Sequence, residues 1–203
     1  MGNLAVLASG SGSNFQAICE ALTAGPHVVV GLLCDRPGAR VLERAEALGV
    51  PSALVPYDTS KGRSSGRSRL IVERRMESIL REWKPDLIAL AGFMRVLSPA
   101  FVNAFPGSIV NIHLSLLPNY PGLDAIRRSY EADDEVVGIT VHFVDAGVDT
   151  GKTIRQETLA KREGETLSQL ETRIHEIEHQ TYPEVILSLL AGSAGLRTEI
   201  SST

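Results

Sequence analysis

The fold is decided near the start of the chain, by the stretch Leu4-Ala5-Val6-Leu7-Ala8-Ser9-Gly10-Ser11-Gly12-Ser13-Asn14. Its first five residues form a short apolar run that predicts a buried strand. From Asn14 to Ala24, apolar residues recur at spacings of three and four, which predicts a helix. A strand that passes through a serine and glycine loop directly into a helix is typical of the first unit of an open α/β sheet.

Apolar runs and helix-like stretches go on alternating through the first half of the chain. The expected strands are Val28–Cys34, Ala53–Val55, Leu87–Ala91 and Ile109–Ile112, and the expected helices are Val41–Leu48 and Val72–Trp83. Strands that alternate with helices predict a parallel sheet whose connections are right-handed crossovers.

The pattern changes in the last third of the chain. Val137–Val144 and Thr153–Leu159 each alternate apolar and polar residues, which predicts an antiparallel hairpin added to the sheet. A helical stripe follows over Leu167–Ile177, and Pro183 is expected to kink or split that helix before Val185–Leu190. The predicted fold class is α/β, an open, mostly parallel twisted sheet with helices on both faces and an antiparallel C-terminal hairpin.

Composition excludes several classes of protein. The 203 residues suit one domain, and 43% hydrophobic with 22% charged residues rules out general disorder. A net charge of −4 and only 5% aromatic residues argue against a basic nucleic-acid-binding domain with stacking platforms. Cys19 and Cys34 have no metal-binding spacing, and no apolar run is long enough to cross a bilayer. We therefore expect a cytoplasmic chain with no nucleic-acid or membrane partner.

The serine and glycine loop is a candidate phosphate site. Backbone N–H groups at the start of a helix bind anions, and small residues allow close approach. The loop lacks the Lys of a P-loop, and Phe15 replaces the third glycine of a dinucleotide fingerprint. A mononucleotide phosphate therefore fits better than a dinucleotide. The alternative is a turn in which a Ser or Asn side chain only caps the helix.

Two later segments hold candidate catalytic groups. Asn111 and His113 face the same way at the carboxyl end of a strand, where one can stabilise an oxyanion and the other can move a proton. The alternative is a His that only hydrogen-bonds locally. Residues Asp145–Gly151 could be an ordinary turn, or their two acidic groups could bind a divalent cation, although the segment lacks the repeated carboxylate pattern of a calcium loop. Alternatively, one of these carboxylates could lie beside His113 and favour its charged form. Spacing in the sequence does not choose between these possibilities.

Two charged segments of the chain suggest other functions. Basic residues at Lys61, Arg63, Arg67, Arg69, Arg74 and Arg75 form a solvated face or attract a polyanionic ligand tail. His175-Glu176-Ile177-Glu178-His179 matches the zinc-binding pattern HExxH, in which Glu176 would be the base and a third ligand would be needed. A zinc hydrolase is therefore the rival hypothesis from another class of enzyme.

Four stretches together resemble the phosphoribosylglycinamide formyltransferase family of folate-dependent enzymes. They are Ala8–Asn14, Leu90–Leu97, Asn111–Pro118 and Val141–Asp149, in the order and spacing of the family, and the likeness runs from about residue 3 to residue 190. The resemblance implies formyl transfer from 10-formyltetrahydrofolate, a co-substrate, to the amine of glycinamide ribonucleotide in de novo purine synthesis. The products would be formylglycinamide ribonucleotide and tetrahydrofolate, with no metal required.

The resemblance also assigns roles to individual residues. The implied catalytic trio is Asn111, His113 and Asp149. The implied glycinamide ribonucleotide site is Gly12, Ser13 and Asn14 at the phosphate, with His175, Glu176, Ile177 and Glu178 on the glycinamide side. The implied folate contacts are Arg69, Met94, Arg95, Val96, Leu97, Asn111, Asp145, Ala146, Gly147, Val148 and Asp149. The chain departs from the family's usual residues at Leu114, Asp124 and Lys152.

The resemblance implies one formyltransferase domain over residues 1–203. Residues 1–107 would be a Rossmann-like, phosphate-binding half, 108–190 the catalytic and folate-side half, and 191–203 a tail. Only small-molecule partners are expected, in a monomer or a homodimer. Methionyl-tRNA formyltransferase and formyltetrahydrofolate deformylase resemble the same core, but we expect neither. The first carries an additional C-terminal RNA-binding domain for which 203 residues leave no room, and the second carries an N-terminal regulatory domain, whereas the first expected strand here starts near Asn3. A third alternative is a nucleotide- or folate-binding module without turnover.

Overall fold

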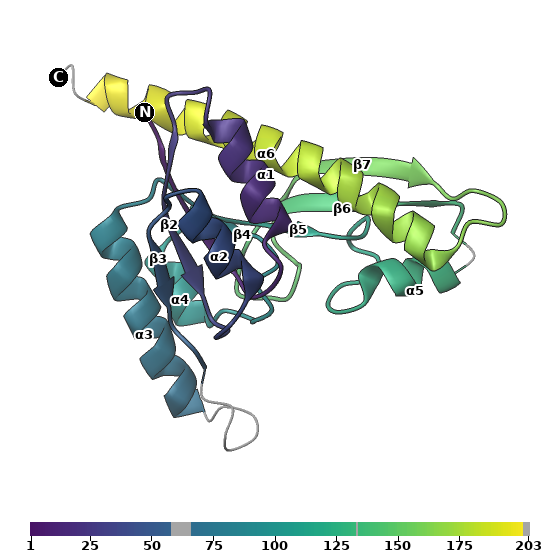
Figure 1. The fold of residues 1–203 in the computed structure, drawn as a ribbon, viewed down its shortest axis with the longest axis horizontal. Helices are drawn as coiled ribbons and strands as arrows, with labels where there is room; N and C mark the ends of the chain where they lie inside the picture. The colour runs from purple at the N-terminus through teal and green to yellow at the C-terminus, as the bar shows by residue number, and fades with distance from the viewer. Residues whose placement is uncertain (58–65, 133, 201–203) are drawn as a thin grey trace.

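The computed structural model describes residues 1–57, 66–132 and 134–200, and Figure 1 shows a twisted sheet between two sets of helices. The strands are β1 Asn3–Ala8, β2 Val28–Cys34, β3 Ser52–Leu54, β4 Leu87–Leu90, β5 Ile109–His113, β6 Val136–Phe143 and β7 Thr153–Ala160. The helices are α1 Ser13–Leu22, α2 Arg40–Ala47, α3 Gly66–Trp83, α4 Pro99–Ala104, α5 Ala125–Glu131 and α6 Leu167–Ile200. The predicted α/β class is confirmed.

The sheet has the strand order β3-β2-β1-β4-β5-β6-β7. Strands β1 to β5 pair in parallel, whereas β6 is antiparallel to both β5 and β7. The predicted C-terminal antiparallel hairpin is therefore confirmed. Strand order reverses between β1 and β4, and open α/β sheets bind ligands in the crevice beyond the carboxyl ends of such strands. The fold thus places the candidate site at the ends of β1, β4 and β5.

The hydrophobic core has two parts, one on each face of the sheet. The larger cluster joins the sheet to α1, α2, α5 and α6, with Phe15, Ile18 and Tyr182 among its fully buried side chains. The smaller cluster packs α3 and α4 on the opposite face, around Met76 and Phe101. Burial of apolar surface on both faces fixes the strands firmly, so the loops at their ends can carry the site.

Two short helices were missed by the sequence reasoning. Helix α4 begins with Ser98 as N-cap, whose side chain accepts a 3.2 Å hydrogen bond from Phe101 N–H, and Pro99 occupies the first turn. Helix α5 follows Asp124, which has φ of 56° and makes no side-chain cap bond. The Ser-Pro pair in front of α4 is a recognised helix start, but neither helix is long enough to show a helical period.

Helix α6 is continuous, so the predicted split at Pro183 is wrong. Pro183 removes one backbone donor, at a typical cost of about 3 kcal/mol. On either side of it, Tyr182 and Ile186 are fully buried in the larger core, and this packing offsets the lost bond. The helix also runs to Ile200, past residue 191, where the predicted tail begins, and residues 201–203 lie outside the described residues. Across the described chain, no helix combines the length and the apolar surface needed to cross a membrane.

Candidate active site at the carboxyl ends of the strands

The loop after β1 is held in shape by donors from two helices. Its carbonyl groups accept hydrogen bonds from Val41 N–H to Gly10 (3.2 Å), from Arg44 Nε to Ser11 (2.9 Å) and from Gln16 N–H to Gly12 (3.0 Å). With the carbonyls engaged, the N–H groups of the first turn of α1 are the donors available to an anion.

Gly12 is the N-cap of α1, with φ of 77° and no side-chain cap bond. The alternative in which a Ser or Asn side chain caps this helix is therefore wrong. A Cβ atom at Gly12 would come within 2.6 Å of Val41 in α2, so the close packing of α2 against the loop requires glycine. The hypothesis that this loop binds a phosphate, by contrast, is still supported by the N–H groups at the start of α1.

Asn14 joins this loop to α6. Its Nδ2 donates a 2.6 Å hydrogen bond to Glu178 Oε1, while Glu178 Oε2 lies 2.7 Å from His175 Nδ1. The hydrogen bond to Glu178 raises the pKa of His175 above its usual value. Of the other predicted residues on this helix, Glu176 is exposed and Ile177 packs against the larger core. The structure thus brings His175 and Glu178 together with the loop.

His113 and Asp149 lie side by side, as the family resemblance implied. His113 Nδ1 is 3.4 Å from Asp149 Oδ2, and the other ring nitrogen, Nε2, donates to the carbonyl of Tyr120 at 2.8 Å. Asp149 Oδ2 also accepts a 2.8 Å hydrogen bond from Gly122 N–H. Both ring nitrogens of His113 therefore face acceptors, an arrangement that the doubly protonated imidazolium satisfies.

The surroundings of Asp149 favour its charged form. Burial alone would raise its pKa, but the neighbouring His142 ring, the Gly122 N–H and the charge of His113 together hold the pKa below its usual value. Asp149 has φ of 54°, a left-handed backbone conformation that turns the end of its loop toward β5. A carboxylate fixed in this way can hold His113 and stabilise positive charge on its ring.

Asn111 completes the predicted trio through a residue that the sequence reasoning did not single out. In the antiparallel register, Asn111 of β5 pairs with His142 of β6, and Asn111 Nδ2 lies 3.2 Å from His142 Nε2. His142 also lies 3.6 Å from Asp149 Oδ1. A buried His in an alternating strand was the available signal, but the contact depends on strand register across 31 positions.

A cleft of about 530 Å³ opens beside the trio. This volume lies in the range of ligand pockets, roughly 300–1,000 Å³. Its apolar walls come from the segment Phe93–Leu97 and from Ile112, Val144 and Val148. Asp145 and Gly147 of the predicted folate loop also line it, and Asp145 Oδ1 accepts bonds from Gly147 N–H and Thr150 Oγ1. The cleft thus combines apolar walls with a polar loop, as ligand pockets do.

Two predicted folate-side arginines are anchored by carboxylates. Arg69 pairs with Glu73 at 3.0 Å and donates from Nη2 to the carbonyl of Val96 at 2.5 Å. Arg95 pairs with the buried Asp35 at 2.6 Å. Met94 and Val96 are both 55% exposed, whereas Leu97 is buried. The arginines therefore brace the segment of residues 94–97 along the cleft.

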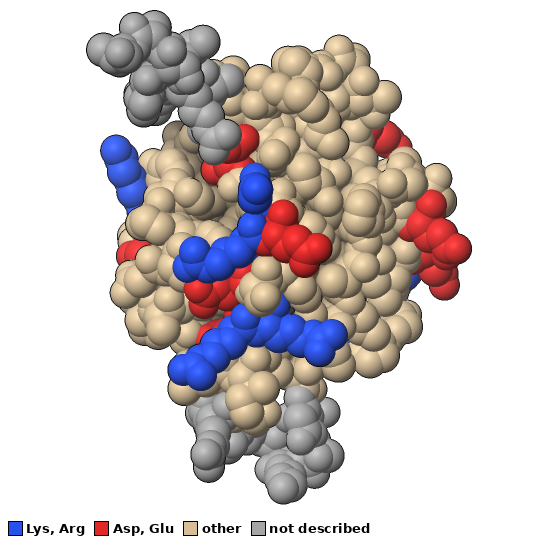
Figure 2. Space-filling view, turned by 90° about the vertical axis from the view of Figure 1, so that its left-hand side faces the viewer, with Lys and Arg blue, Asp and Glu red and all other residues tan. Residues whose placement is uncertain are grey.

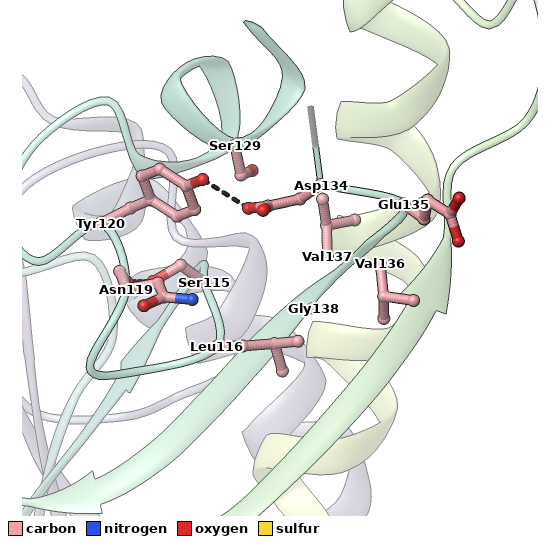
Figure 3. Close-up of a pocket in the computed structure, with 10 residues that line it drawn as sticks. All are labelled: Ser115, Leu116, Asn119, Tyr120, Ser129, Asp134, Glu135, Val136, Val137 and Gly138. Atoms are coloured by element: carbon pink, nitrogen blue, oxygen red, sulfur yellow. Dashed lines mark hydrogen bonds between the residues drawn. The ribbon is translucent and has the colours of Figure 1, made fainter. Parts of the chain in front are cut away.

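A second cavity, of about 420 Å³, is lined by residues from Ser115 to Gly138. Figure 3 shows the Tyr120 ring pointing at Asp134, to which its hydroxyl donates a hydrogen bond. None of the described residues lines both cavities. Tyr120 nevertheless connects them, because its carbonyl accepts the bond from His113. The Tyr120–Asp134 contact thus braces the segment whose carbonyl accepts the bond from His113.

The structure also bears on two alternatives from the sequence, the HExxH zinc site and the basic segment. The His175 and His179 rings stack with centroids 6.2 Å apart, and in the described part of the chain no cluster of three metal-ligand side chains forms around them. Lys61, Arg63 and the Arg67 side chain lie outside the described residues. On the face that α3 contributes to, Figure 2 shows basic side chains interleaved with acidic ones, and Arg81 pairs with Glu77 there. That face resembles a solvated helix surface more than a patch of one sign.

Comparisons with known proteins agree with this geometry. The family described as "Formyl transferase" matches residues 2–186. The chain is 42% identical to phosphoribosylglycinamide formyltransferase of Bacillus subtilis, over 94% of this chain and 95% of that protein. It is 40% identical to the trifunctional purine biosynthetic protein adenosine-3 of Drosophila melanogaster, over 98% of this chain and 15% of that protein. The structure of glycinamide ribonucleotide transformylase 1 from Geobacillus kaustophilus superposes with a TM-score of 0.83 at 45% identity, over 94% of this chain and 99% of that one.

Proposed function

The chain belongs to the formyl transferase family, and from this premise we propose that it moves a formyl group from 10-formyltetrahydrofolate to the amine of glycinamide ribonucleotide. The observation that carries the proposal is the contact of His113 with Asp149 in the lining of a cleft that also includes Glu178, the hydrogen-bond partner of Asn14 in the loop after β1. The products are formylglycinamide ribonucleotide and tetrahydrofolate, in purine synthesis.

The ribonucleotide is proposed to bind between α1 and α6. Its phosphate would accept hydrogen bonds from the backbone of Gly12, Ser13 and Asn14, where the helix dipole favours negative charge. Asn14 Oδ1 is buried and has no hydrogen-bond partner among the described residues, beside the bond that Asn14 Nδ2 donates to Glu178. His175 and Glu178 would face the glycinamide side, with Glu176 and Ile177 as neighbours on the same helix.

The folate co-substrate is proposed to occupy the cleft. Its apolar walls and its volume suit a flat ring, and the ring's polar edge would meet the loop of residues 145–149. Arg69 and Arg95 would act through the segment of residues 94–97, whose backbone and exposed side chains Met94 and Val96 line the cleft. The proposed reaction requires no metal.

The proposed reaction follows from the positions of the trio. The substrate amine forms a bond to the formyl carbon, and negative charge develops on the formyl oxygen. Asn111 and the imidazolium of His113 stabilise that oxygen, and Asp149 balances the positive charge. The bond from carbon to the folate nitrogen then breaks, and the proton lost by the amine reaches that nitrogen through His113, Asp149 or water.

We propose that one formyltransferase domain spans the chain, with the halves 1–107 and 108–190 meeting at the cleft. Residues of the first half supply the phosphate loop, and residues of the second supply the trio. Both substrates are small molecules, and a cytoplasmic location is part of the proposal.

The test is a spectroscopic assay of folate product with both substrates and the purified chain. Turnover is expected only when glycinamide ribonucleotide and 10-formyltetrahydrofolate are both present. Free glycinamide, which has no phosphate, should be a much weaker acceptor. Binding of both ligands without product would instead establish a non-catalytic module, and zinc-dependent hydrolysis lost in His175→Ala would favour the hydrolase.

A further inference from the structure

His142 occupies a buried position between two members of the trio. Its ring lies opposite Asn111 in the β5–β6 register and is only 2% exposed. Nδ1 lies 2.8 Å from the carbonyl oxygen of Phe143, and Nε2 lies 3.2 Å from Asn111 Nδ2. Nothing in the proposed reaction uses His142 directly, yet each of its nitrogens has one close polar partner.

These two contacts determine which nitrogen of the neutral His142 ring carries the proton. A carbonyl oxygen can only accept a hydrogen bond, so Nδ1 must carry a proton. In the neutral ring Nε2 is then an acceptor, and Asn111 Nδ2 donates to it. The amide of Asn111 is thereby oriented, because its NH₂ end faces His142. The second hydrogen on the same nitrogen is left to donate toward the cleft.

We propose that His142 is a positioning residue that makes Asn111 present an N–H, and not its carbonyl oxygen, to the formyl oxygen. This inference rests on the proposed function. An amide turned the other way would set an acceptor against the developing negative charge. Because the two ends of an amide have nearly the same shape, packing alone cannot choose between them, whereas a ring nitrogen that only accepts can.

The charged groups near His142 do not orient the Asn111 amide in its place. Asp149 Oδ1 is the competing partner of Nε2: it lies 3.6 Å away, against 3.2 Å for Asn111 Nδ2, and a proton on Nε2 would donate to it and help to lower the pKa of Asp149. The shorter contact assigns Nε2 to Asn111, while Asp149 contacts His113 of β5 through its other oxygen. On β7 the register partner of His142 is the uncharged Thr153, and α6 brings Glu171 and Glu178 to the cleft. A protonated His142 would donate from both nitrogens, toward Asp149, and Asn111 would lose its acceptor.

The first experiment measures the protonation form of the His142 ring directly. Long-range ¹H–¹⁵N spectra of the histidine rings, recorded on the wild-type chain near neutral pH, distinguish the two neutral forms and the cation. His142 is assigned by the signal missing in His142→Gln. We expect the neutral form with the proton on Nδ1. A proton on Nε2, or a cationic ring at the pH where the enzyme turns over, overturns the proposal.

The second experiment compares two replacements. His142→Leu removes the acceptor, whereas His142→Gln can supply an amide oxygen near the position of Nε2. We expect Leu to lower kcat on the order of 10²-fold, as loss of an oxyanion donor does, with KM for both substrates within about twofold. Gln should recover most of that loss. His27→Gln is the matched control, since that ring also accepts a backbone N–H bond, from Gly2, far from the cleft.

Equal losses in kcat for the Gln and Leu variants, at equal melting temperature, would contradict the role, and so would full activity in the Leu variant. If the Leu variant does not fold, the ring spectra of the wild-type chain still decide. Absence of formyl transfer in the wild-type chain would refute the proposed function, whereas the ring form is measured without turnover. The two failures are therefore distinguishable.

Discussion

Asn14 of α1 and Glu178 of α6 are joined by a 2.6 Å hydrogen bond although 164 positions separate them in the chain. This bond ties the phosphate loop to the helix that closes the larger core. A ligand bound by the loop would therefore be held by a segment that is itself anchored to α6.

Replacement of Glu178 by Gln should lower the pKa of His175, because the hydrogen bond that His175 donates to the Glu178 carboxylate is the main cause of the raised value. The His175–Glu178 pair contributes stability that is fully present below pH 6.5, the usual value, and is lost as pH rises through the raised pKa. NMR titration of His175 in both chains measures the shift. Glu176→Gln is the control, since that side chain is exposed, and it should leave the His175 titration nearly unchanged.

Asp149→Asn should lower kcat by about 10²–10³-fold, a typical effect of losing one stabilising group at a developing charge. The amide cannot balance an imidazolium at His113, 3.4 Å away, although it keeps the size of the side chain. His113→Ala should lower kcat to a similar extent. Turnover of Glu157→Gln, a change in a surface ion pair with Arg155, should match wild type. Near-normal turnover in both site variants would mean that the trio is assigned wrongly.

Arg69→Ala should weaken binding of the folate co-substrate and leave binding of the ribonucleotide nearly unchanged. Arg69 donates to the carbonyl of Val96, so its loss frees the segment that lines the cleft. A hydrogen bond from a charged donor contributes about 1.5–3 kcal/mol, which corresponds to a rise in folate KM of about tenfold or more. Arg74→Ala, an exposed position on the same helix, is the comparison. If KM rises equally for both substrates, the assignment of Arg69 to the folate side is wrong.

Gly12→Ala should raise KM for the ribonucleotide and lower the free energy of unfolding by about 1–3 kcal/mol. The new Cβ would meet Val41 at 2.6 Å, and φ of 77° is strained for alanine. Gly10→Ala meets nothing within 4 Å, so its free energy of unfolding should stay close to that of wild type. Urea titrations of the three chains measure the difference. Equal stabilities for the two variants would show that α2 does not constrain the loop.

Tyr182→Phe should destabilise the fold without changing the reaction. The fully buried hydroxyl shares its single hydrogen between the carbonyls of Leu90 (3.0 Å) and Val110 (3.1 Å), which lie on neighbouring strands. Both acceptors would remain buried with one donor fewer, at a cost of about 1–3 kcal/mol in the free energy of unfolding. Tyr130→Phe loses a single bond, to the Glu165 carbonyl, at a less buried position and should lower the melting temperature less.

Local patterns predicted much of the fold. The strands and long helices follow from apolar periodicity, and the serine and glycine loop follows from its place between β1 and α1. Pro183 was misjudged because a local rule about proline meets a helix whose neighbouring residues are deeply buried. Tertiary packing outweighed local preference there, which no window of sequence can show.

Contacts between distant residues could not be predicted in the same way. The trio was proposed from resemblance, and its spacing in the chain left several arrangements open. His142 meets Asn111 only because β6 pairs with β5 in one register, and a shift of one residue would turn the ring to the other face of the sheet. Register depends on the whole hairpin, so the partner of Asn111 emerges only from the fold.

The two outermost strands bear on the behaviour of the protein at high concentration. β3 is three residues long, and β7 carries the charged pair Arg155 and Glu157 on its exposed length. Short or charged edge strands discourage another chain from adding to the sheet. The enzyme can therefore expose both rims of a seven-stranded sheet and still resist growth into aggregates.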